Sequence, residues 1–77
     1  MDVEDRANNA QRIINDDAFK EAYNGVLSYH TGTFLNPASS EDEIMEAHRA
    51  VRALALIRDE LQSFIDSGEI QKRKKKR

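Results

Sequence analysis

Apolar residues recur every three or four positions through the second half of the chain, and this spacing constrains the fold more than any other feature of the sequence. Between residues 41 and 67 one such stripe runs without interruption through Ile44, Ala47, Val51, Leu54, Ile57, Leu61, Phe64 and Ile65. A repeat of 3.6 residues is that of an amphipathic α-helix, whereas a half-buried strand alternates every two residues. The stripe therefore predicts a helix that ends before Gly68 and is about 40 Å long at 1.5 Å per residue.

A second apolar stripe adjoins the first on the same predicted helix. It consists of Ala50, Ala53 and Leu56. A helix that packs on one neighbour needs only one stripe, and alanines let another backbone approach closely. The second stripe is either the edge of a wide core face or a surface on which copies of the chain associate. We take these three residues as the candidate oligomer interface.

Two shorter helical patterns precede the long one. Apolar residues follow the helical period at Val3, Ala7, Ala10, Ile13 and Ile14, and again at Phe19, Ala22, Tyr23, Val26, Leu27 and His30. Asp16 lies between the two patterns, and aspartate is a favoured residue for capping the N-terminus of a helix. The sequence therefore predicts a break between the first and the second helix at this position.

Residues 31–40 form the one clear loop signal. Gly32 is placed to cap the C-terminus of the second helix, and Pro37 disfavours a helical conformation of the residue before it. Ser40 and Glu43 have the spacing of a capping box at the start of the third helix. A short connection between two amphipathic helices predicts a helical hairpin. The expected fold is all-α: a self-associating hairpin with an additional N-terminal helix, in a single domain of residues 1–68.

The length of the chain limits the core that it can bury. A domain of 77 residues gains little stability from its own core, and such chains often depend on disulfides, metals or oligomerisation. Cysteine is absent and histidine occurs only twice, so we expect a homo-oligomer. The sequence contains no 18-residue apolar run, which predicts no membrane partner. Its acidic, polar first ten residues do not resemble a secretory signal, which predicts a cytosolic protein.

No catalytic motif is visible, and we expect neither an enzyme nor a bound cofactor or metal. The acidic residues gather at the predicted helix N-termini, where capping and the helix dipole account for them. His48 has no histidine four residues away, which a zinc-binding helix would require, and is expected at the surface or at an interface. His30 is expected to cap helix carbonyls. No catalytic residue is therefore assigned.

Positive charge is concentrated in the last nine residues, 69–77, which form a predicted basic C-terminal tail. Residues 1–68 carry thirteen acidic and six basic residues, whereas the whole chain has a net charge of only −2. The basic residues of the tail are Lys72, Arg73, Lys74, Lys75, Lys76 and Arg77. Such a cluster binds polyanions by releasing their counterions. Three interpretations remain open: an arm that contacts nucleic acid, an arm that docks on an acidic protein, and a solvated tail that aids solubility.

Parts of the sequence resemble small helical proteins encoded in the head and packaging gene clusters of tailed bacteriophages. The similar segments are "RANNAQRIINDDAFKEAY" and "EAHRAVRALALIRDELQSFIDSGEI". The resemblance is carried by Arg6, Ala7, Ile13, Asp16, Phe19, Ala22, Arg52, Ala53, Leu54, Leu61 and Gly68. The chain departs from the family at Asp17, where members usually have proline.

The resemblance implies a role in head assembly or DNA packaging, by analogy with small terminase subunits. The corresponding partners would be DNA and phage head or packaging proteins, in the host cytoplasm or in association with the virion. Together with the basic tail, this predicts a non-enzymatic, oligomeric factor that contacts nucleic-acid backbone through residues 72–77. The alternative is a protein-interaction module, either a scaffold-like factor or an inhibitor of a host protein.

Overall fold

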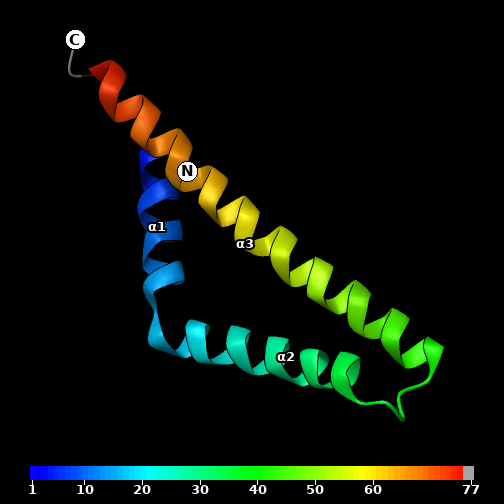
Figure 1. Ribbon diagram of the computed structural model, residues 1–77. Helices are drawn as coiled ribbons and strands as arrows, with labels where there is room; N and C mark the ends of the chain where they lie inside the picture. Colours follow the sequence, from blue (N-terminus) through cyan, green and yellow to red (C-terminus); the bar gives the residue numbers. More distant parts are fainter. Residues whose placement is uncertain (76–77) are drawn as a thin grey trace.

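Three helices make up the fold in the computed structural model, which describes residues 1–75. They are α1 (Val3–Asn15), α2 (Asp17–Leu35) and α3 (Glu41–Lys75), and the described residues contain no strand. Figure 1 shows them as the sides of a narrow triangle: α1 crosses the C-terminal part of α3, and α2 returns along α3 to its N-terminal end. The predicted all-α hairpin with an additional N-terminal helix is confirmed.

Side-chain caps fix where each helix begins. Asp2 accepts a hydrogen bond from the backbone N–H of Asp5 at the start of α1, and Asp16 accepts one from Phe19 at the start of α2, both at 2.8 Å. Asp16 itself has an extended backbone, with φ −71° and ψ 129°. The predicted break between the first two helices is therefore confirmed, together with the residue that makes it.

The predicted capping box at the start of α3 is also confirmed. The backbone N–H of Ser40 donates to Glu43 Oε1 at 3.0 Å, and the N–H of Glu43 donates to Ser40 Oγ at 3.1 Å. The hydrogen bond from the backbone N–H of Ser40 to the carboxylate, with a smaller contribution from the Ser40 side chain, holds the pKa of Glu43 below its ordinary value of 4.5. The stabilisation is therefore present above the ordinary carboxyl pKa and is lost as the pH falls through the lowered one.

Two glycines that were predicted to end helices lie inside them instead. α2 continues past Gly32 to Leu35 and ends at Asn36, whose N–H donates to the Gly32 carbonyl at 3.0 Å. The loop is therefore shorter than residues 31–40, and His30 lies within α2, where its ring meets Tyr29 edge-on, rather than at a helix end. α3 likewise continues past Gly68 to Lys75. A glycine that caps a helix usually adopts a positive φ, and none does so among the described residues.

Gly68 serves close packing rather than helix termination. Its backbone lies against α1, where an added Cβ would overlap the Cβ of Ala7 and stand 3.8 Å from the carbonyl oxygen of Val3. Ala7, Ala10, Ile65 and Gly68 are all buried here. One further contact joins the same two helices: the guanidinium of Arg6 lies 4.4 Å from the ring centroid of Phe64. Small residues on both helices thus let α1 rest directly on the backbone of α3.

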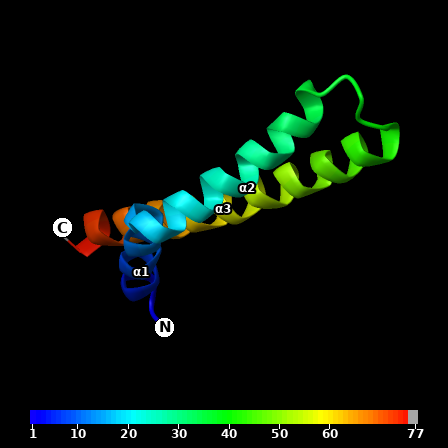
Figure 2. The same ribbon diagram turned by 90° about the horizontal axis from the view of Figure 1, so that it is seen from below.

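The core is small and lies mostly at this crossing. Among residues 1–75 the buried hydrophobic residues are Ala7, Ala10, Ala47 and Ile65. α2, described in full, has no buried residue. The molecule extends 58 × 22 × 18 Å, and Figure 2 shows α1 projecting to one side of the α2–α3 pair. No helix in the described part of the chain has the length and apolar character needed to span a membrane.

Replacing Gly68 with alanine is expected to destabilise the chain. Alanine is the better helix former by about 1 kcal/mol, but its methyl group would collide with Ala7, and overpacking of this kind costs about 1–3 kcal/mol. Urea unfolding followed by circular dichroism should therefore show a lower free energy of unfolding for Gly68→Ala. The double variant Ala7→Gly with Gly68→Ala should recover part of the loss. A Gly68→Ala variant more stable than the parent chain would contradict the packing role.

Candidate functional site

The basic residues expected to form a separate tail belong to the last described turn of α3. Lys72, Arg73, Lys74 and Lys75 are helical and exposed. Successive residues of an α-helix lie about 100° apart around its axis and 1.5 Å apart along it. The four side chains therefore point to all sides of the helix within about 5 Å of its length. The arrangement is a compact positive tip rather than a stripe along one face. Lys76 and Arg77, also predicted to bind nucleic acid, lie outside the described residues.

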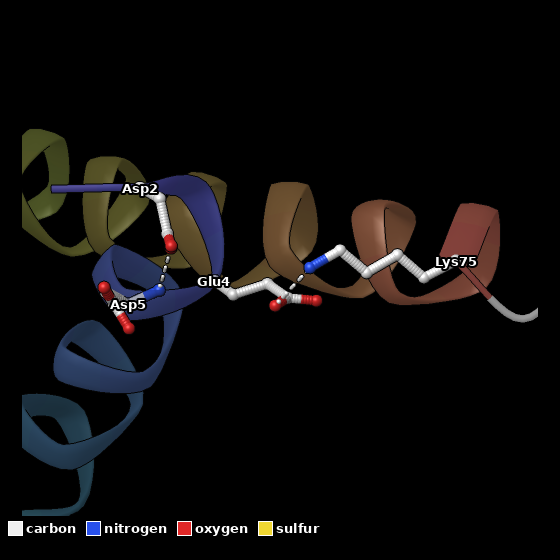
Figure 3. Close-up of polar contacts among 4 residues, drawn as sticks. All are labelled: Asp2, Glu4, Asp5 and Lys75. Carbon is white, nitrogen blue, oxygen red and sulfur yellow. Dashed lines mark hydrogen bonds and ion pairs between the residues drawn. The ribbon is translucent and has the colours of Figure 1, made fainter.

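One of these cations, Lys75, forms an ion pair with a residue near the N-terminus of the chain. Lys75 Nζ donates to Glu4 Oε2 at 2.9 Å, and this is the ion pair found within residues 1–75. Figure 3 shows the Glu4 side chain reaching from the first turn of α1 toward Lys75, beside the Asp2 cap. The pair is accessible to water, since 61% of the Lys75 side chain and 26% of the Glu4 side chain are exposed.

Negative charge in the first turn of α1 acts on Lys75 through this contact. The hydrogen bond that Lys75 donates to Glu4, followed by the charge of Glu4 and a smaller effect of Asp2, raises the pKa of Lys75 above its ordinary value. The stabilisation is complete below the ordinary lysine pKa and is lost as the pH rises through the raised one. Lys75 thus remains a cation at neutral pH, and a phosphate group would have to compete with Glu4 for it.

The sequence predicted both charge clusters but not their meeting. Acidic residues at Asp2, Glu4 and Asp5 and basic residues from Lys72 onward lie at opposite ends of the chain. In the sequence, the opposite signs of the two clusters were the signal from which a contact between them could have been predicted. The close approach at Gly68 brings them together, because it sets the first turn of α1 beside the C-terminal part of α3.

The candidate oligomer interface on α3 is mostly open to solvent. Ala53 is exposed, Leu56 is 64% exposed and Ala50 is half-buried. The neighbouring Ile57 is also 55% exposed. The chain itself covers little of this stripe, so it lies outside the core that α1 and α3 form.

Other parts of the surface include a hollow of about 150 Å³ between α2 and α3, which is lined by Tyr29, His30, Thr33, Glu43, Glu46 and Ala47. A hollow of about 260 Å³ at the corner between α1 and α2 is lined by Ile14, Asn15, Phe19, Lys20, Tyr23, Asn24 and Arg58. Its two charged residues are both cations, so it contains no acid–base pair. Across the described residues there is also no group of three or more His, Cys, Asp or Glu side chains placed to hold a metal ion. His48 lies exposed on α3.

Comparison of the chain with protein-family models, curated proteins and solved structures found no match.

Removing the carboxylate of Glu4 is expected to lower the pKa of Lys75. Glu4→Gln abolishes the charge that stabilises the lysine cation and leaves only a weaker neutral acceptor. An NMR titration that follows the lysine side-chain signals should show one resonance moving back toward the ordinary lysine value. Glu21→Gln, the same change on α2, should leave that resonance in place. An unshifted Lys75 in the Glu4 variant would show that the two groups do not interact in solution.

Proposed function

We propose that this chain is a non-enzymatic, self-associating factor that binds the backbone of nucleic acid through the basic tip at the C-terminal end of α3. In the setting that the sequence resemblance implies, this would be phage head assembly or DNA packaging. The exposure of Lys72, Arg73 and Lys74 on all sides of the helix supports the proposal most directly.

The charge at the tip is greater than the helix itself requires. A helix dipole places about half a negative charge at the C-terminus, which one nearby cation can balance. The sequence supplies six basic residues from Lys72 to Arg77, and Lys75 already has Glu4 as its partner. Within the described residues, Lys72, Arg73 and Lys74 therefore remain for a polyanion.

The density of the tip is suited to a phosphate backbone. Duplex DNA carries one negative charge per about 1.7 Å of its axis, and α3 presents one cation per about 1.5 Å over its last described turn. No aromatic residue lies between the cations, so stacking on bases does not contribute. Contacts to phosphates alone carry no sequence information. We therefore expect binding that is electrostatic, weak for a single tip and indifferent to sequence.

The acidic remainder of the chain favours contact through the tip alone. Residues 1–68 carry thirteen acidic and six basic residues, and this excess repels a polyanion. Association of several copies would join weak tips into one multivalent surface, which raises the overall affinity without any new contact. Self-association and backbone binding thus support each other in this proposal.

Removing half of the positive charge of the tip is expected to weaken binding to DNA strongly. The triple variant with Lys72→Gln, Arg73→Gln and Lys74→Gln removes three charges, while glutamine preserves helix propensity. The triple variant Arg49→Gln, Arg52→Gln and Arg58→Gln is the matched control, because it also removes three charges and these arginines are exposed on α3 away from the tip. For the parent chain, fluorescence anisotropy on labelled duplexes should give a log–log salt slope of about −3 to −5. Duplexes of different sequence should bind equally.

The same measurement separates the alternatives. If the triple variant of the tip binds as well as the parent chain, the tip is not the contact. If the arginine control alone loses binding, the surface lies on the middle of α3. If the parent chain fails to bind at low salt, backbone binding is wrong and a protein partner becomes the better explanation of the tip.

Freeing Lys75 from Glu4 is expected to strengthen the binding. Glu4→Gln releases one cation and removes one nearby negative charge, so the salt slope should steepen by about 0.9 if Lys75 then meets a phosphate. Glu21→Gln changes the net charge equally but lies far from the tip, and should raise the affinity less. If the two variants raise the affinity for DNA equally, Glu4 acts only through the net charge and not through its contact with Lys75.

A further inference from the structure

Helix α2 has a largely uncharged surface that the chain does not bury. Charged residues make up 34% of the protein, yet residues 22–40 contain no Asp, Glu, Lys or Arg. Surface helices of globular proteins usually carry charged or polar residues on the side that faces water. None of the nineteen residues of α2 is buried. The composition of α2 is that of a covered helix, but its own chain leaves it open.

Two sides of α2 are apolar, and the rest of the chain covers only one of them in part. Phe19, Tyr23, Leu27 and His30 follow the helical period and are partly covered. A second set lies about a third of a turn away around the helix axis, and all of its members are exposed. We call this set the outer α2 face: Ala22, Gly25, Val26, Tyr29 and Gly32. Its large members, Val26 and Tyr29, are 45% and 74% exposed.

The two glycines of this face have no role within the chain. Glycine is a poor helix former, and Gly25 and Gly32 both lie inside α2 with ordinary helical backbone. Nothing stands within 4 Å of the position that a Cβ would take at either residue. Gly68, by contrast, is required by the approach of α1. The seven-residue spacing places Gly25 and Gly32 on the same side of α2, where a second helix could approach the backbone closely.

We propose that a second copy of this chain docks on the outer α2 face, so that two α2 helices pack against each other across a two-fold axis. The area of the molecule supports this occupant. A compact monomer of 8.8 kDa would expose about 4,800 Å², whereas this chain exposes 6122 Å². The excess of about 1,300 Å² exceeds the area of roughly 800 Å² that each partner buries in an interface of standard size.

Charge also favours a second copy over an unrelated partner. An isologous contact buries the same patch of both copies, so a face with a net charge of one sign would repel its equivalent on the second copy. The outer α2 face has no charged residue, although residues 1–68 as a whole are acidic. The face thus avoids the repulsion that two copies would experience elsewhere on their surfaces. A strongly basic or acidic partner would gain nothing from it. The inference does not depend on nucleic-acid binding.

Introducing a charge at the centre of the face tests the proposal. Sedimentation velocity of the parent chain, from low to high micromolar concentration, should give a mass near twice 8.8 kDa. Val26→Glu should return the chain to monomer, because each copy would bury a carboxylate opposite its equivalent. Ser28→Glu places the same charge on the polar side of α2 and should leave the dimer intact.

Several outcomes would overturn the proposal. If the parent chain is a folded, helical monomer at every concentration tested, no second copy docks on α2. A dimer that survives Val26→Glu, or that Ser28→Glu disrupts equally, associates through another face. The triple glutamine variant of the tip should remain dimeric. Loss of DNA binding therefore tests the proposed function, and loss of the dimer tests the α2 interface separately.

Alanine at the glycines gives a second measurement that does not rely on an introduced charge. If the outer face were open to water, Gly25→Ala and Gly32→Ala would each raise the thermal midpoint by roughly 4–8 °C through helix propensity alone. If a second α2 packs there, the added methyl groups obstruct the contact, and the dimer dissociation constant should rise at least about tenfold. If the thermal midpoint rises and the dimer dissociation constant does not change, the glycines and the centre of the outer α2 face lie outside the interface.

Discussion

The close approach of α1 to α3 at Gly68 is the contact on which the rest of the structure depends. A glycine on α3 facing Ala7 on α1 lets the two backbones meet with only one methyl group between them. Three of the four buried hydrophobic residues in the described chain, Ala7, Ala10 and Ile65, belong to these two helices near the crossing. The crossing sets how α1 lies on α3, and Asp16 then ends α1 and begins α2. It also sets Glu4 beside Lys75. The position of α2 and the electrostatics of the tip both follow from this contact.

Local signals predicted this fold well, because side-chain caps and apolar periods act over a few residues. Asp16 and the pair of Ser40 and Glu43 make the hydrogen bonds that their spacing predicts. The two glycine assignments failed for a different reason. Glycine is suited both to helix ends and to close helix contacts, and only the tertiary structure distinguishes the two. For the end of α2, the stronger signal was Asn36 before Pro37, since a residue that precedes proline avoids the helical region.

For the tip and the candidate interface, sequence could supply composition but not placement. It located the cations from Lys72 onward, but it gave no indication that α3 continues beneath them or that Glu4 meets Lys75. It singled out Ala53 and Leu56, which the structure leaves exposed. It did not single out α2 as an outward-facing helix, because Val26 and Tyr29 have the spacing of ordinary core residues. Only their exposure in the folded chain shows that α2 carries more apolar surface than the chain's own core covers.

The two proposed surfaces occupy different parts of an elongated molecule, and this separation determines how they can cooperate. The radius of gyration is 16.8 Å, against about 11.5 Å for a compact domain of this length. The tip lies at the C-terminal end of α3, and α2 runs toward the opposite end (Figure 1). A dimer formed through α2 therefore leaves both tips uncovered, and each keeps its own Glu4–Lys75 contact. Two such tips on one rigid particle would bind a polyanion as a bivalent unit, with an effective concentration set by their spacing. Because association does not bury the cations, dimerisation and polyanion binding do not compete, and bivalent contact would make each favour the other.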